Sequence, residues 1–564
     1  MRREISRREM LSRTSRAALI SSIAFPHCLA QQKSRTRWEP GAIVGENEGM
    51  RVGLKILADG GNAVDAAVGA ALTASVAAPA RSGIAGYGGH MVIALAGGKT
   101  ITAIDFNTVA PAAARPDMFP LDETGAVKGR ANFFGWLAAG VPGVLAGLQL
   151  ALDRYGTRSF RELVQPAIQI AEKGFVINKT FGNTLHTAAA RFASDAGSAK
   201  LYFKDGQILK EGEVLRNPGL AKMLSALAER NSVESFYRGD IAQRIAEGFQ
   251  KNSGLVTARD LAAYHAREVQ PLQLPIANFA VFTAPLTAAG LTILEALAIL
   301  KALDFAKIAD TGPAAHAQLE AMRLAWKDRL ELFGDPEQVK VPVEKLLSPD
   351  YAHELASKVQ TAVKEKKPIE TGVPKHTDDG TNNLCVVDRH GNLVAITLTH
   401  GSSFGAQVTV EGLGLTLGHG MSRFDPHPSH PNSPGSGKRP VHNMCPSIVV
   451  RDGVPIMSVG CAGGVRIPNC IIDMLTQSLL RGVSMHSAVA APRLHCTGTL
   501  DVGVEPHWPK DSAEYLREIG FKVQTGESTA VVGAASFDPK TGECDATIRG
   551  PAILGLNLPD SSSR

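Results

Sequence analysis

The chain has 564 residues, of which 44% are hydrophobic and 20% are charged, and its formal net charge is +5. A chain of this composition can bury a large core, and its length alone would allow several domains. Residues 1–30 contain six Arg and two Glu, so +4 of the total charge of +5 belongs to this segment, and the basic balance does not indicate nucleic-acid binding.

The N-terminal segment has the pattern of an export signal. Residues 6–11 read Ser-Arg-Arg-Glu-Met-Leu, an apolar run follows at 17–25, and small residues at 28–30 offer a cleavage site. The apolar run is too short for a permanent membrane helix, and no later run is long enough to predict one. We therefore predict a twin-arginine signal peptide over 1–30 and a periplasmic or secreted mature chain. The alternative is an arginine-rich surface segment that stays in the mature protein.

The next part of the chain alternates helical and strand patterns. Asn62 with Asp65 three positions later forms a capping pattern, so we interpret Asp65 as a cap and not as a catalytic acid. Apolar residues at helical spacing predict helices over 64–72, 145–151, 160–171, 220–228, 241–249 and 314–332, and strands are predicted over 91–95 and 100–105. This alternation is typical of a layered α+β fold.

A Gly-Thr pair precedes a predicted β-hairpin. Apolar, β-branched runs at 384–387 and 393–399 flank a turn at 389–392, which places Thr381 opposite Thr399 and His400. A hydroxyl nucleophile needs a base. In a chain that begins with threonine, the α-amine has a pKa of about 8 and can serve as that base. Cleavage between Gly380 and Thr381 would create that amine. Taken alone, a Gly-Thr pair more often simply begins an edge strand.

A second hairpin leads into a glycine-rich turn. Its own turn is at 452–453, its return strand is expected to end at Gly460, and an amphipathic run follows at 467–480. Between them, the backbone N–H groups of Gly463 and Gly464 would be left to stabilise a developing negative charge. The alternative is a turn that uses glycine only for its backbone angles.

Four histidines crowd the segment before this hairpin, namely His419, His427, His430 and His442. Their spacing matches no compact ligand motif, and the prolines between them predict an extended loop, so we expect no metal site and no other cofactor. We expect His442 to contact substrate, because it precedes the strand beside the glycine turn.

Cysteines offer two further interpretations. Cys28 lies in the predicted signal and six others follow Thr381, an even number that permits disulfides in an exported protein. Cys385 and Cys461 lie in a predicted strand and in the glycine turn, where buried thiols are the better interpretation. Cys445 with His442 as its base remains an alternative nucleophile.

Short motifs in order along the chain carry a family resemblance. They are Gly-Gly-Asn-Ala-Val-Asp-Ala-Ala at 60–67, Ser-Gly-Ile-Ala-Gly-Tyr-Gly-Gly at 82–89, Ala-Ile-Asp-Phe at 103–106, Gly-Val-Pro-Gly at 140–143 and Gly-Cys-Ala-Gly-Gly-Val-Arg-Ile at 460–467, with shorter matches at 155–157, 215–218, 320–325, 438–440 and 492–493. From about residue 41 to the C-terminus the chain resembles the γ-glutamyltransferase (glutathione hydrolase) family.

The resemblance implies an N-terminal-nucleophile hydrolase with an αββα sandwich of the α+β class. It implies a proenzyme that cuts itself into a large subunit, 31–380, and a small subunit, 381–564, which stay together. By similarity, Thr381 attacks an amide carbonyl and Thr399 hydrogen-bonds the nucleophile. The backbone N–H groups of Gly463 and Gly464 would hold the oxyanion.

The resemblance is weakest where family members grip the γ-glutamyl group. The departures are Asn107 for an arginine that binds the α-carboxylate, Gly401 for an asparagine, Gly420 and Arg423 in a segment that holds the α-amino group with acidic and amide residues, and His442 and Asn443 for paired serines. Arg423 stands where an acid is expected and would attract a carboxylate instead of an ammonium group. The alternative for Arg423 is a surface ion pair in a proline-rich loop.

These observations predict a self-cleaving amidohydrolase or acyltransferase. It would form an acyl-enzyme on Thr381 and release it to water or an amine, and its substrate would be an N-acyl compound that carries a carboxylate. The alternatives are a true γ-glutamyltransferase or glutathione hydrolase and a non-catalytic periplasmic binding protein. Expected partners are a small-molecule amide or γ-glutamyl-type substrate and the two subunits of one precursor, with no nucleic acid and no stable membrane span.

Overall fold

The computed structural model describes residues 40–309, 311–372, 381–528 and 530–549. The predicted signal peptide and Gly380 lie outside the described residues. Within these ranges, no helix combines the length and the hydropathy that crossing a bilayer requires.

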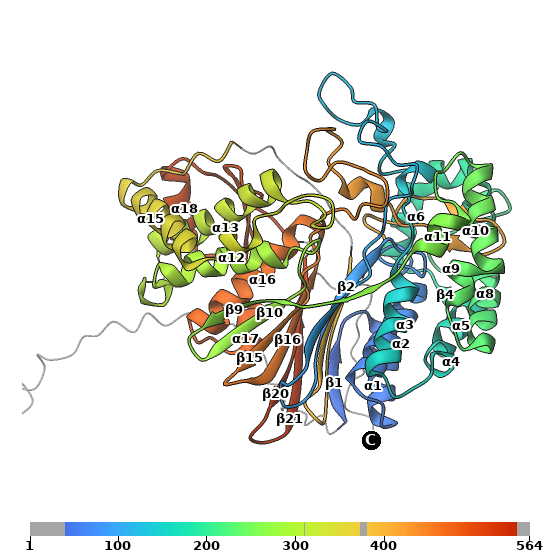
Figure 1. Ribbon diagram of the computed structural model, residues 1–564, viewed down its shortest axis with the longest axis horizontal. Helices are drawn as coiled ribbons and strands as arrows, with labels where there is room; N and C mark the ends of the chain where they lie inside the picture. The colour runs from blue at the N-terminus through green and yellow to red at the C-terminus, as the bar shows by residue number, and fades with distance from the viewer. Residues whose placement is uncertain (1–39, 310, 373–380, 529, 550–564) are drawn as a thin grey trace, which may run out of the picture. The chain divides into compact units, whose positions relative to one another are not determined.

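Two six-stranded sheets lie at the centre of the fold (Figure 1). All neighbouring strands within them run antiparallel. In spatial order, the first sheet holds β1 (Gly41–Val44), β11 (Asn382–Asp388), β12 (Leu393–Thr399), β2 (Gly88–Ala94), β3 (Ile101–Asp105) and β8 (Arg267–Val269). The second holds β21 (Glu543–Arg549), β20 (Val531–Asp538), β16 (Val454–Ala462), β15 (Ser447–Arg451), β10 (Phe279–Thr283) and β9 (Leu272–Ile276).

Four strands of the first sheet, β1, β11, β12 and β2, are buried on both faces. In β11, Cys385 and Val387 join an apolar cluster shared with the second sheet, whereas Leu384 and Val386 pack among the helices. Alternate side chains of a strand point to opposite faces, so a strand between a sheet and a helical layer has no polar face. This explains why the predicted hairpin is an almost unbroken apolar run.

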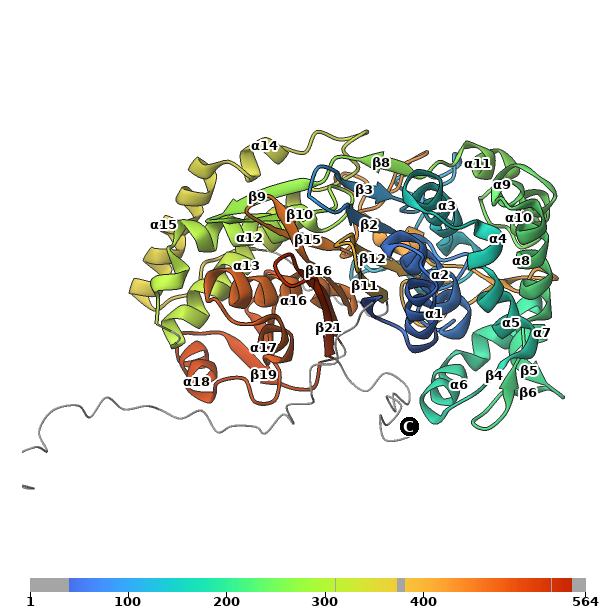
Figure 2. The ribbon, with the colours of Figure 1, turned by 90° about the horizontal axis from the view of Figure 1, so that it is seen from below.

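Helices cover the outer face of each sheet, which gives four layers (Figure 2). Over the first sheet lie α1 (Asn47–Ala58), α2 (Ala63–Ala77), α3 (Val144–Tyr155), α4 (Phe160–Leu163), α5 (Gln165–Lys173), α8 (Pro218–Arg230), α9 (Glu234–Arg238), α10 (Asp240–Lys251) and α11 (Ala258–Ala263). Over the second lie α12 (Gly290–Ala302), α13 (Gly312–Leu332), α14 (Val343–Leu346), α15 (Pro349–Glu365), α16 (Ile467–Leu475), α17 (Met485–Ala490) and α18 (Lys510–Glu518). The predicted αββα sandwich is confirmed.

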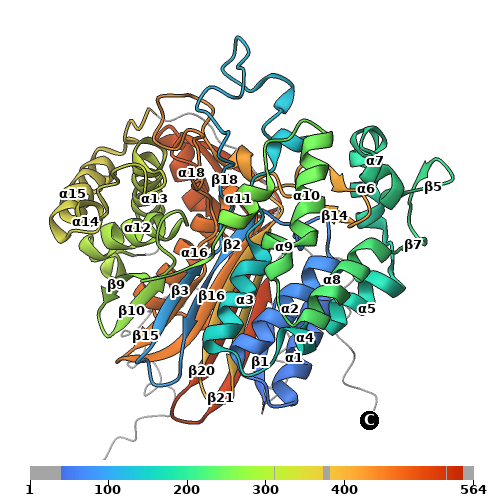
Figure 3. The same cartoon turned by 45° about the vertical axis from the view of Figure 1, so that its right-hand side comes forward.

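Smaller elements flank these layers. Figure 3 shows α6 (Lys179–Ser194) and α7 (Ala196–Tyr202) near the outer ends of α5 and α8. The short strands are β4 (Phe175–Val176), β5 (Phe203–Lys204), β6 (Gln207–Ile208), β7 (Val214–Leu215), β13 (Thr409–Val410), β14 (Leu415–Thr416), β17 (Leu494–His495), β18 (Asp501–Val504) and β19 (Lys522–Thr525).

Most elements predicted from the sequence are present with small shifts of their ends, but the single helix predicted over 160–171 is divided at Val164 into α4 and α5. The return strand β16 runs two residues past the predicted end at Gly460, and the amphipathic run is an α-helix only to Leu475, followed by a π-helical turn at Thr476–Leu480. Asp65 is confirmed as a cap, because Asn62 and Asp65 form a reciprocal capping box at the start of α2.

Gly460 marks a close approach of the two sheets. A Cβ on Gly460 would lie 1.8 Å from Oδ1 of Asn383, so only glycine lets β16 pass this point on β11. The contact lies two residues from Thr381 and three from Gly463, and it therefore brings the start of β11 beside the glycine turn.

Candidate active site

Thr381 lies directly before the first residue of β11 and is buried, with 5% of its surface exposed. The hairpin register pairs Asn382 with Leu398, and one further step along it sets Thr381 opposite Thr399, as predicted. Thr399 is buried at the end of β12, and its Oγ1 accepts a hydrogen bond from the Gly401 N–H at 2.8 Å. Thr381 directly precedes β11 and Thr399 is the last residue of β12. The two threonines therefore lie at the same end of this antiparallel strand pair.

The glycine turn follows β16, a central strand of the second sheet that packs against β11 and β12. Gly463 has a φ of +142° and Gly464 a φ of +58°, values that favour glycine, and a 3₁₀ turn at Gly464–Arg466 leads into α16. Neither N–H group donates to a backbone carbonyl among the described residues. The turn therefore presents two backbone donors at the end of a buried strand, as the sequence predicts.

A cavity of about 600 Å³ connects these parts, and its lining includes Thr381, Ala462 and Gly463. Ile170, Phe175, Val176 and Phe181 form an apolar part of its wall. The structure therefore brings the predicted nucleophile and one predicted oxyanion glycine to the same cavity, although the strands next to them belong to different sheets.

The same cavity contains charged residues that the sequence analysis missed. Arg81 and Glu46 both line it, and Glu46 also caps α1 by accepting the Gly49 N–H at 2.8 Å. Burial raises the pKa of Glu46 and lowers that of Arg81, and the charge of Glu46 partly offsets the latter shift. The arginine just before the Ser82 motif was the available signal.

A second cavity, of about 240 Å³, adjoins the glycine turn. Arg423, Asn443 and Val465 line it, and Val465 directly follows Gly464. Two of the predicted substrate residues are therefore brought together beside the turn. Arg329 of α13 also lines this cavity, and its Nη2 donates to Oδ1 of Asn443 at 2.9 Å. The sequence analysis did not single out Arg329.

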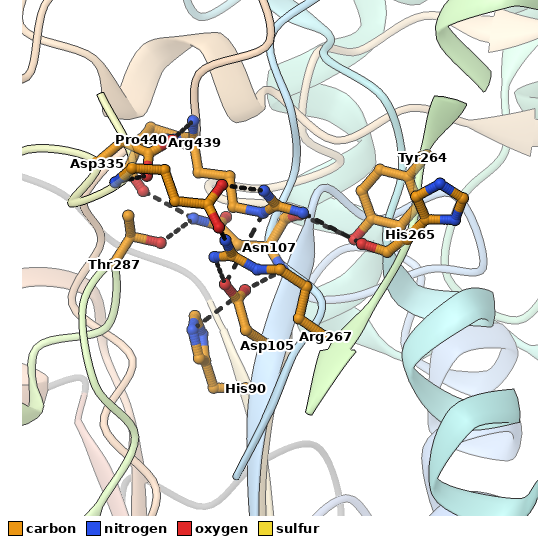
Figure 4. Close-up of polar contacts among 11 residues, drawn as sticks. His90, Asp105, Asn107, Tyr264, His265, Arg267, Thr287, Asp335, Arg439 and Pro440 are labelled. Atoms are coloured by element: carbon orange, nitrogen blue, oxygen red, sulfur yellow. Dashed lines mark hydrogen bonds and ion pairs between the residues drawn. The ribbon is translucent and has the colours of Figure 1, made fainter. Parts of the chain in front are cut away.

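Asn107 is held in a polar network between the two sheets (Figure 4). Its amide nitrogen donates to Oγ1 of Thr287 and to the carbonyl of Pro440, both at 2.7 Å, and the residue is fully buried. Beside it, Asp105 pairs with Arg267 and lies 3.8 Å from Nε of Arg439. Asn107 lines neither of the two cavities, so its observed contacts are with the protein's own core.

Gly401 and Gly420 have no room for a side chain. A Cβ on Gly401 would lie 2.2 Å from Cε1 of His419, and one on Gly420 would lie 2.5 Å from Cγ2 of Thr108. The His419 ring is held in place because its Nε2 accepts the Ser402 N–H at 2.5 Å. The imidazole thus occupies the space that an asparagine at position 401 would need.

Gly401→Asn is therefore expected to destabilise the protein by at least about 1–3 kcal/mol, the usual cost of overpacking a core, with an added penalty from its φ of +102°. Denaturant unfolding measures the change. His419→Ala combined with Gly401→Asn should recover part of the loss, because the double variant removes the clashing ring. A single variant as stable as the wild type would contradict this account.

The four histidines are spread over different environments. His442 is buried, its Nδ1 accepts the Met444 N–H at 3.1 Å, and its ring lies 4.7 Å from that of His90. His427 contacts Asp425 at 2.8 Å, and Nε2 of His430 lies 2.7 Å from the Leu330 carbonyl oxygen. His442 lines neither cavity, and the expected substrate contact stays a prediction.

The six cysteines in the described ranges are buried and free, which agrees with the interpretation of Cys385 and Cys461 as buried thiols. Burial raises the pKa of Cys385 to about 12 and raises that of Cys445 further above its ordinary value. A thiol with so high a pKa is a poor nucleophile at neutral pH, which argues against Cys445 as the nucleophile.

Comparison with known proteins agrees with this arrangement. The gamma-glutamyltranspeptidase family model matches residues 49–552. The glutathione hydrolase proenzyme of Escherichia coli (strain K12) is 36% identical over 494 residues, covering 85% of this chain and 84% of that protein. The acylase ACY 1 proenzyme of Pseudomonas sp. (strain V22) is 32% identical over 508 residues, covering 89% of each.

A solved structure shares the fold over nearly the whole chain. The crystal structure of cephalosporin acylase from Bacillus halodurans matches with a TM-score of 0.81 at 27% identity, covering 94% of this chain and 99% of that one. Family model, relatives and fold agree, and the chain belongs to the gamma-glutamyltranspeptidase family, whose members are hydrolases and transferases of the N-terminal-nucleophile type.

Proposed function

We propose that this protein is a self-cleaving amidohydrolase or acyltransferase that uses Thr381 as its nucleophile. The observation that carries the proposal is the cavity that Thr381 and Gly463 share. In it, a buried hydroxyl lies beside a turn whose N–H groups donate to no backbone carbonyl among the described residues. Cleavage of the Gly380–Thr381 bond would supply the α-amine that acts as the base.

The chemistry then follows in two steps. Oγ1 of Thr381 attacks the amide carbonyl carbon and gives its proton to the α-amine, while the N–H groups of Gly463 and Gly464 stabilise the oxyanion. The C–N bond breaks, the leaving amine takes that proton, and an ester to Thr381 remains. Water, or an acceptor amine, attacks the ester and releases the acyl group, and the proton returns to Oγ1.

We further propose that the acyl group carries a carboxylate and lacks a free ammonium group. Arg423 stands in the cavity beside the glycine turn, and Gly401 with His419 leaves no room for the asparagine that family members place there. A pocket with an arginine in place of an acid disfavours the α-ammonium of a γ-glutamyl group.

A matched pair of substrates tests this assignment. γ-Glutamyl-p-nitroanilide and glutaryl-p-nitroanilide differ only in the α-ammonium group. We expect a higher kcat/KM for the glutaryl compound. The reverse preference would favour the alternative function, a true γ-glutamyltransferase or glutathione hydrolase. If the wild type remains one uncut chain and hydrolyses neither substrate, the result would favour a non-catalytic binding protein.

Thr399→Val should lower kcat for the preferred anilide by at least about 10-fold. The variant removes the hydroxyl proposed to orient the nucleophile, and it leaves the Gly401 N–H without its acceptor at a cost of about 1–3 kcal/mol of folding free energy. Steady-state kinetics and denaturant unfolding measure the two effects. Thr399→Ser keeps the hydroxyl and should retain most of the activity, so equal losses in both variants would argue against the proposed role.

We also propose that the mature protein is periplasmic or secreted and consists of subunits 31–380 and 381–564. The support is the pattern of the first 30 residues, with arginines at positions 7 and 8. Replacing both arginines with lysine should prevent export, and fractionation of the expressing cells would detect the precursor in the cytoplasm.

A further inference from the structure

We propose that Arg329 and Arg423 together hold the anionic end of the substrate's acyl chain, which makes Arg329 a specificity-determining residue. The inference rests on the proposed acyl transfer at Thr381 and names the second guanidinium of the acyl pocket.

Arg329 is a buried cation without an acidic partner among the described residues. It is 6% exposed, its Nη2 donates to Asn443, and its Nη1 has no hydrogen-bond partner there. The other buried guanidinium of the same helix does have a counter-ion, because Arg323 pairs with Glu320 at 2.7 Å. A buried charge with no counter-ion is costly, so the exception needs an explanation.

The cavity itself does not supply the missing anion. Asp425 is the carboxylate in its described lining, and it is already paired with His427 at 2.8 Å and lies 3.9 Å from Nε2 of His430. Arg423 adds a second guanidinium to the same lining. Two arginines beside one small hollow create a positive potential that suits an anionic ligand.

The pKa values of the neighbouring groups agree with such a potential. The pKa of Arg329 is lowered to about 10, chiefly by burial, with an opposing effect of Cys445 and a lowering effect of the Arg423 charge, so Arg329 is still protonated at neutral pH. Burial holds the pKa of His442 well below its ordinary value, and the charges of Arg329 and Arg423 contribute. His442 is therefore neutral and does not compete for the anion.

The position of this cavity fits the acyl half of the substrate. Val465 lines it and directly follows Gly464, whereas Gly463 lines the cavity that holds Thr381. An acyl group whose carbonyl oxygen rests at the glycine turn can thus extend toward the two arginines while the amine leaves on the Thr381 side. Asn443 accepts a hydrogen bond from Arg329 and would thereby orient the Arg329 guanidinium toward the ligand.

The test compares two anilides that differ only in the terminal carboxylate, glutaryl- and butyryl-p-nitroanilide. In Arg329→Met we expect kcat/KM for the glutaryl substrate to fall by about 10- to 100-fold, the usual effect of losing a charge-assisted contact, and that for the butyryl substrate to change by less than about 3-fold. Arg423→Met should act in the same direction. Arg329→Lys should show an intermediate loss, because lysine keeps the positive charge but lacks the planar guanidinium that can donate two parallel hydrogen bonds to a carboxylate.

Arg259→Met, on the exposed face of α11, removes one positive charge away from both cavities and should change neither value. Equal losses for both substrates in Arg329→Met would show a merely structural role and overturn the inference. If that variant does not fold, an unchanged glutaryl-to-butyryl ratio in both Arg423→Met and Arg329→Lys would overturn it instead.

Binding of free glutarate separates this inference from the proposed function. Calorimetric titration of the wild type with glutarate should show binding that Arg329→Met weakens at least about 10-fold, and butyrate should bind weakly to both. Wild type that binds glutarate in this way but hydrolyses no anilide would contradict the proposed function and leave the anion site standing. If the wild type hydrolyses the glutaryl substrate and the Arg329→Met variant does so equally well, the anion site would be contradicted and the proposed function would stand.

Discussion

Thr381→Ala is expected to leave residues 381–564 joined to the preceding chain and to abolish amide hydrolysis. The variant removes the one hydroxyl that lies at the start of β11 within the cavity of the glycine turn. Loss of a nucleophile in other acyl-transfer enzymes lowers kcat by roughly 10⁴- to 10⁶-fold, and here it would also prevent formation of the α-amine. Intact mass under denaturing conditions should show two fragments in the wild type, the second beginning at Thr381, and one chain in the variant.

Thr381→Ser is the matched control for this experiment. It keeps a hydroxyl at the same position and should still be cleaved, at a lower rate. Thermal unfolding of the uncut Thr381→Ala chain would show that the fold is intact. A Thr381→Ala protein that is cut at the same bond, or that hydrolyses the anilide at the wild-type rate, would rule out Thr381 as the nucleophile.

Gly463→Ala is expected to lower kcat by about 10²- to 10³-fold, the usual effect of losing one oxyanion donor. Gly463 has a φ of +142°, and a Cβ there would lie 2.8 Å from Cα of Ala530, so the turn must shift to accept the methyl group. A shift of the turn moves the N–H groups away from the carbonyl oxygen of the substrate. Steady-state kinetics on the preferred anilide measures the loss.

Gly482→Ala provides a control of similar backbone type. Gly482 also has a positive φ, of +69°, but a Cβ there meets nothing within 4 Å, and the residue lies outside the lining of both cavities. It should cost about 1 kcal/mol of stability and leave kcat unchanged. A Gly463→Ala enzyme that folds and keeps its kcat would show that this turn does not hold the oxyanion.

Local patterns predicted the parts of this site well. The β11–β12 hairpin is encoded by two apolar runs and the turn between them, and the observed register places Thr381 opposite Thr399. The cap at Asn62 and the glycine turn after β16 are likewise set by residues close together in the chain. Such features depend on backbone angles and on hydrogen bonds over a few residues, which a single sequence contains.

Long-range contacts were not predictable in the same way. Arg329 belongs to a helix whose pattern shows only that it is buried, and nothing local indicates that its guanidinium meets Asn443. The sequence shows that Gly401 departs from the family pattern. Only the structure shows why a larger residue does not fit there, because the His419 ring fills the neighbouring space. Arg81 directly precedes the Ser82 motif, and no local pattern indicates that it lines the cavity of Thr381.

The sequence by itself determined the local elements, the family resemblance and the residues predicted to do the chemistry. Only the tertiary structure decided which of them meet, because Thr381 and Gly463 adjoin strands of different sheets and share a cavity where Gly460 lets β16 approach β11. The same packing of layers brings Arg329 beside Arg423 and Asn443. Contacts of this kind depend on how whole layers are buried against one another, and no period or turn motif along the chain records them.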